Sequence, residues 1–70
     1  MEISYDPKHD VTYIRFSNGK IVETAEVEEG VIVDYGENGE IIGIEIIGAS
    51  MRAHAPITEI TFKLEEATAG

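Results

Sequence analysis

The chain has 70 residues, no cysteine and a formal net charge of -9, with 14 acidic residues against five basic ones. This length allows one small domain with a limited core, and the lack of cysteine excludes disulfides and cysteine-based zinc sites. The acidic balance disfavours binding to nucleic acid or to anionic membranes. The start, MEISYDPKHD, lacks the basic-then-apolar order of a signal peptide, and no apolar run approaches the roughly 20 residues of a membrane span. We therefore expect a cytoplasmic protein.

Alternating or β-branched segments separated by turn residues predict five antiparallel strands. The first surrounds Ile3 and Tyr5, and the others cover residues 11–16, 21–27, 30–35 and 40–47. Pro7 suits the first turn, and Asn18-Gly19 carries the signal of a tight hairpin between the second and third strands. Strands at this spacing, joined by short turns, predict an antiparallel β-meander.

The C-terminal third changes character. Residues 48–55 predict a helix of one to two turns, with Ser50 as its N-cap and Pro56 ending it. Beyond the proline, Ile60, Phe62 and Leu64 alternate with polar residues, which favours a final strand over residues 57–66, although the Leu-Glu-Glu-Ala end also suits a helix.

We predict an α+β fold for residues 1–67, in which the helix and the final strand pack on one face of the meander, and a disordered tail at 68–70. The expected core consists of Val11, Tyr13, Ile14, Phe16, Val31, Val33, Ile42, Ile44, Ile46 and Met51.

Residues 34–45, DYGENGEIIGIE, come close to a calcium-binding EF-hand loop. Asp34, Asn38, Gly39 and Glu45 occupy its first, fifth, sixth and twelfth positions. That loop must join two helices, whereas both flanks here are strand-like, and Gly36 at the third position has no side chain to bind a metal. We interpret the segment as a hairpin in which Asn38-Gly39 adopts the positive φ angles of a tight turn.

Two other groups of polar residues are candidates for a site. Asp6, His9 and Asp10 share one turn and, with His54, could bind a metal or a small ligand or serve a small enzyme. No serine lies in a nucleophile elbow, so catalysis is the alternative rather than the main hypothesis, and we expect no cofactor. Glu45 lies within the most apolar segment, where a buried carboxylate needs a partner, and we expect a structural ion pair with Arg15 or Arg52.

Four motifs in this order resemble a known family. They are Tyr-Asp-Pro-x-x-Asp at residues 5–10, the aromatic strand at 13–16, the segment ending in Gly-Val-Ile-Val-Asp-Tyr at 26–35, and Gly-x-Ile-x-Gly-Ile-Glu-Ile at 39–46. The chain resembles, from Ile3 to about Arg52, the domain-of-unknown-function family numbered 2283, small bacterial and archaeal proteins. The resemblance implies a β-meander with a helix, and a role as the antitoxin-like half of a toxin–antitoxin pair.

Two expectations about partners follow. An antitoxin-like module would bind a basic toxin-type protein, and we expect the contact at an exposed strand edge together with Glu23, Glu26, Glu28 and Glu29. So small a core also favours a homodimer, in which the strand at 58–64 pairs with a second copy across a sheet edge.

Overall fold

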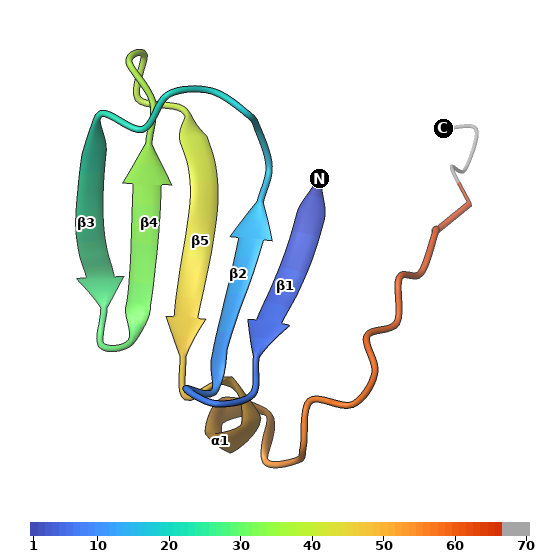
Figure 1. Cartoon of the computed structure of the whole chain (residues 1–70). Helices are drawn as coiled ribbons and strands as arrows, with labels where there is room; N and C mark the ends of the chain where they lie inside the picture. Colours follow the sequence, from blue (N-terminus) through green and yellow to red (C-terminus); the bar gives the residue numbers. More distant parts are fainter. Residues whose placement is uncertain (67–70) are drawn as a thin grey trace.

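The computed structural model, which describes residues 1–66, contains one five-stranded antiparallel sheet and one short helix, so the protein is mostly β (Figure 1). The strands are β1 (Glu2–Asp6), β2 (Val11–Arg15), β3 (Glu23–Glu28), β4 (Val31–Tyr35) and β5 (Ile41–Ile47), followed by α1 (Ala49–Ala53). The five predicted strands and the short helix are confirmed. None of the helices in the described part of the chain is long and apolar enough to cross a membrane.

The order of the strands in the sheet, β1-β2-β5-β4-β3, differs from the predicted meander. β2 pairs with β5 instead of β3. The residues between β2 and β3 form a loop that carries the chain to the opposite edge of the sheet, where β3 lies. Asn18-Gly19 does not form the predicted hairpin; Ser17 Oγ accepts a hydrogen bond from the Gly19 amide within this crossing loop. The apolar β5 thereby gains a neighbour on both sides, while the acidic β3 takes an edge, where charged side chains stay in water.

The register gives the sheet one apolar and one polar face. One row across all five strands is apolar: Ile3, Ile14, Ile44, Val33 and Ala25. The next row, on the opposite face, reads Ser4, Tyr13, Glu45, Ile32 and Glu26. Because side chains alternate between faces along a strand, these two rows define the apolar face and the polar face.

Only part of the predicted core is buried. Val33 and Ile42 are, together with Ala49, the buried hydrophobic residues of the described chain, and Ile42 is completely covered. Phe16 and Met51 were expected in the core, but they are 48% and 76% exposed. The reason is that α1 lies at one end of the sheet instead of on its apolar face (Figure 1).

Residues 57–66, which we call the C-terminal arm, form neither the predicted strand nor a helix. The arm leaves α1 and runs away from the sheet beyond β1 (Figure 1). Within the described chain the arm pairs with no strand of the sheet, and it does not cover the apolar face. The predicted tail at 68–70 lies outside the described residues.

Candidate protein-binding surface

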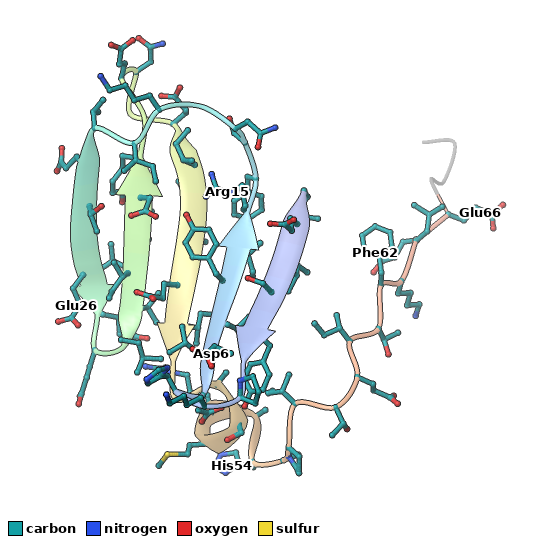
Figure 2. All side chains as sticks on the ribbon, viewed as in Figure 1. Asp6, Arg15, Glu26, His54, Phe62 and Glu66 are labelled. Carbon is teal, nitrogen blue, oxygen red and sulfur yellow. The ribbon has the colours of Figure 1, made fainter. Side chains whose placement is uncertain are left out.

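The four predicted contact residues lie together at one edge of the sheet. Glu23, Glu26 and Glu28 belong to β3, and Glu29 follows in the turn to β4. All four are exposed, and Figure 2 shows Glu26 at the outer border of the sheet. Within the described residues β3 pairs only with β4, so the other side of its backbone is free to accept a further strand.

A hollow of about 670 Å³ adjoins this edge. Its lining includes the acidic Glu26, Glu28 and Glu29 and the apolar Ile47 and Met51. Ile47 is 43% exposed and Met51 is 76% exposed, so both leave apolar surface in contact with water. The lining thus combines acidic and apolar side chains with the guanidinium of Arg52, which pairs with Glu28 and leaves Glu26 and Glu29 without an ion-pair partner among the described residues.

Arg52 holds α1 against the same turn. It donates hydrogen bonds to the carbonyl oxygens of Glu29 and Ile47, and its guanidinium lies 3.8 Å from the Glu28 carboxylate. The ion pair is exposed and contributes little by itself. The three contacts of Arg52 together place α1, and with it Met51, beside the acidic turn.

A chain of hydroxyl and carboxylate groups crosses the polar face. The Tyr13 hydroxyl donates to Asp34 Oδ2 and the Thr24 hydroxyl donates to Asp34 Oδ1, both at 2.7 Å. The hydrogen bond to Asp34, followed by burial, raises the pKa of Tyr13 above its usual value. Tyr13 reaches β4 by passing over Gly43 of β5, where a side chain would collide with the phenol. This network connects β2, β4 and β3 across β5. Its one signal in the sequence is a glycine within an apolar strand.

The expected pairing of Glu45 with arginine is not formed. Neither of the two ion pairs within residues 1–66 includes Glu45, whose neighbours in the register are Tyr13 and Ile32. Arg15 instead lies over the Tyr13 ring, 5.5 Å from its centre, and Arg52 binds the β3–β4 turn. Glu45 is only half-buried, so its charge remains partly solvated and needs no such partner.

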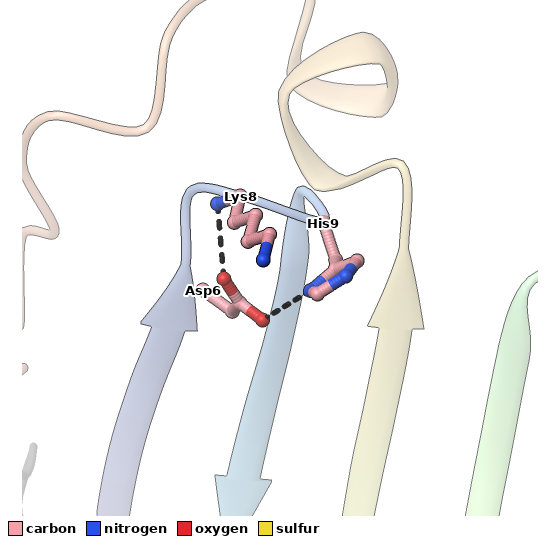
Figure 3. Close-up of polar contacts among 3 residues, drawn as sticks. All are labelled: Asp6, Lys8 and His9. Atoms are coloured by element: carbon pink, nitrogen blue, oxygen red, sulfur yellow. Dashed lines mark hydrogen bonds and ion pairs between the residues drawn. The ribbon is translucent and has the colours of Figure 1, made fainter.

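The two acidic residues at the β1–β2 turn, Asp6 and Asp10, have different hydrogen-bond partners. Asp6 accepts the Lys8 amide at 2.9 Å and lies 2.8 Å from Nδ1 of His9 (Figure 3). The hydrogen bond with His9 holds the pKa of Asp6 below its usual value. This exposed pair closes the turn.

Asp10 connects the same turn to the start of α1. Its carboxylate accepts hydrogen bonds from the Tyr5 hydroxyl at 2.6 Å and from the Ser50 hydroxyl and amide. These bonds, that of Tyr5 first, hold the pKa of Asp10 below its usual value, and the same contact raises the pKa of Tyr5. Ser50 is therefore not the N-cap, which is Gly48, but a donor to a carboxylate 40 residues away.

The predicted metal or ligand group is thus distributed over different contacts. Asp6 pairs with His9, Asp10 binds Tyr5 and Ser50, and His54 follows the end of α1 as its C-cap. No three histidine or acidic residues within 1–66 are arranged to hold a metal ion.

The segment that resembles a calcium loop is the β4–β5 hairpin. Asp34 lies in β4 and Glu45 in β5, and the turn closes through the Gly36 amide and the Glu40 carbonyl at 2.8 Å. Gly39 has a φ of 78°, as a tight turn requires, but Asn38, contrary to our expectation, does not adopt a positive φ. The Asn38 amide instead donates to the Glu40 carboxylate.

Comparison with known proteins identifies relatives of the strand-forming part of the chain. Residues 2–50 match the model of the family described as "Protein of unknown function (DUF2283)". An uncharacterized protein of Methanocaldococcus jannaschii is 32% identical over 50 residues, which are 71% of this chain and 42% of that protein. The chain thus spans less than half the length of this relative. No solved structure matches.

Proposed function

We propose that this chain, which belongs to the DUF2283 family of proteins of unknown function, is a protein-binding module whose acidic sheet edge binds a basic toxin-type partner. The observation that carries the proposal is the coincidence, at β3, of an unpaired strand edge, four exposed glutamates and a partly apolar hollow. The unpaired strand edge and the exposed glutamates suit a protein partner better than a small substrate.

The free backbone of β3 supports binding by strand addition. In this mode an extended segment of the partner pairs with the edge strand, and main-chain hydrogen bonds provide much of the affinity. β3 supplies six residues for such pairing. Its glutamates would keep copies of this chain from pairing with each other through β3, because like charges would meet across the new ladder.

Charge supports a basic partner. The net charge of -9 attracts a positive surface, which speeds encounter and makes binding sensitive to salt. The hollow beside β3 suits a lysine or arginine of the partner, since its aliphatic stem can lie along Ile47 and Met51 while its charged end meets Glu26 or Glu29. Nucleic acid does not fit a surface of this charge.

The alternative, a small-ligand or metal site at Asp6, His9, Asp10 and His54, is favoured by no specific contact. The bonds of Asp6 and Asp10 already serve the turn and α1. A metal assay on protein purified without an affinity tag addresses it directly, and stoichiometric metal would support it.

Co-expression with the neighbouring genes, followed by pull-down, tests the proposal. We expect a complex with a small basic protein, and we expect changing Glu26, Glu28 and Glu29 together to Gln to weaken it by more than about tenfold at low salt. The matched control changes Glu37, Glu65 and Glu66 to Gln, which removes the same charge from the β4–β5 turn and the arm and should alter affinity far less. The proposal fails if no neighbour binds, or if affinity ignores both salt and the change at β3.

A further inference from the structure

The chain as a whole, including its C-terminal arm, leaves an unusual amount of surface in water. The chain exposes 5657 Å², whereas a compact protein of its 7.7 kDa mass exposes about 4300 Å². Ile60, Phe62 and Leu64 of the arm are 60%, 80% and 85% exposed, and Phe62 projects far from the sheet (Figure 2). An apolar stripe of this kind is costly in water unless something covers it.

The arm has the pattern of a strand with one apolar side. Ile60, Phe62 and Leu64 alternate with Glu59, Thr61 and Lys63, so an extended arm presents apolar groups to one side and polar groups to the other. The sheet has the same division into an apolar and a polar face. If the arm added as a strand at a sheet edge, its apolar side chains could therefore continue the apolar face and its polar side chains the polar face.

β1 provides such an edge. It is the outer strand opposite β3, and within the described residues it pairs only with β2. It directs Ile3, 41% exposed, to the apolar face and Ser4 to the polar face. β1 carries acidic residues only at its two ends, Glu2 and Asp6, whereas β3 carries three glutamates along its length, so the centre of β1 is the less charged edge for an added strand.

From this match we infer that two copies of the chain exchange their C-terminal arms, each arm adding as a sixth strand to the β1 edge of the other copy. In this arrangement Ile60, Phe62 and Leu64 extend the apolar face beyond Ile3. Glu59, Thr61 and Lys63 extend the polar face beyond Ser4. The inference concerns β1 and is independent of the partner proposed for β3.

The surface area and the path of the chain favour a second copy. A stable interface buries roughly 800 Å² per partner, and the excess exposed surface of about 1300 Å² per chain is sufficient to supply it. Ile57 is still half-buried, but from Thr58 onward the arm is exposed and runs away from its own sheet (Figure 1). Exchange of an identical segment is a low-cost route to a dimer, since each copy supplies the strand the other lacks.

The first test is the mass of the full chain in solution, measured by analytical ultracentrifugation. We expect twice the mass of one copy at micromolar concentration, and a monomer at high micromolar concentration would overturn the inference. Phe62→Glu should raise the dissociation constant of the dimer more than tenfold, because it places a charge on the covered side of the arm. Thr61→Glu adds the same charge on the polar side and should change it far less; equal effects would contradict the arrangement.

Cross-linking distinguishes exchange between copies from folding back onto the same copy. The chain has no cysteine, so single cysteines can be introduced cleanly. Copies carrying Ser4→Cys are mixed with copies carrying cysteine at Glu59, Thr61 or Lys63, and a short bis-maleimide is added. Exchange predicts a cross-linked heterodimer from at least one mixture. A single chain that carries both cysteines serves as the control for folding back. Exchange at β1 is wrong if no mixture cross-links, or if the only cross-link forms within that doubly substituted chain.

Discussion

Replacing Gly43 by Ala is expected to lower the free energy of unfolding by about 2 kcal/mol, because a Cβ at this position collides with Tyr13. The phenol would have to rotate away, and Asp34 would lose one of its two hydroxyl donors. The Ile14 carbonyl, 3.0 Å from the added Cβ, limits any shift of the strand itself. Urea denaturation followed by circular dichroism measures the loss.

The control for this prediction is Gly36→Ala. There the added Cβ meets only the end of the flexible Glu40 side chain, which can move into solvent and would give up only the exposed hydrogen bond that it accepts from the Asn38 amide. We therefore expect a change of less than about 1 kcal/mol, well below that of Gly43→Ala. In a Tyr13→Ser background the Gly43 substitution should cost much less than in the wild type, and full additivity of the two changes would show that the collision is not the cause.

Replacing Asp10 by Ala is expected to lower the melting temperature clearly, because this carboxylate joins the β1–β2 turn to α1. The change removes the acceptor of Tyr5 and Ser50, and it places alanine at a φ of 54°, which is unfavourable for a residue with a Cβ. Asp10→Asn tolerates this φ and keeps one acceptor oxygen, so it should fall between alanine and the wild type. Asp6→Asn, in the same turn but without contact to α1, is the control, and an equal loss there would contradict the assigned role.

The lowered pKa of Asp10 also predicts the direction of a pH effect. Its folded-state pKa lies below its ordinary value, so the ionised form stabilises the fold above that ordinary value, and this stabilisation is lost as pH falls through the lowered pKa. Asp10→Asn should therefore lose less stability than the wild type on acidification. An unchanged acid transition in this variant would show that Asp10 does not contribute.

The strands could be predicted from the sequence because their signals are local. The isoleucine-rich run in Ile41–Ile47 and β-branching in Val31–Tyr35 each act within a few residues, and both segments are strands in the structure. The strand order could not be predicted in this way, because it depends on which strand is the most apolar and therefore gains most from a neighbour on each side. Asn18-Gly19 indicated a hairpin locally, yet the pairing of β2 with β5 required a crossing loop there.

The candidate site could be predicted where it depends on charge and not where it depends on distant contacts. The acidic stretch around Glu26 is visible in the sequence, and so is its strand-like pattern. The bonds from Tyr13 and Thr24 to Asp34 join residues 21 and 10 positions apart, and those from Ser50 to Asp10 join residues 40 positions apart. No local pattern reports such pairs, which is why Asp34 resembled a calcium ligand and Asp10 a metal ligand.

The central claim is that a protein partner adds to the free edge of β3, and amide hydrogen exchange of the free chain and of its complex tests this most directly. In the free chain the β3 amides that do not pair with β4 should exchange quickly, because water reaches them. In the complex we expect these amides to be protected, while those of β1 keep the same rates. A complex that protects other surfaces and leaves β3 unchanged would contradict the claim.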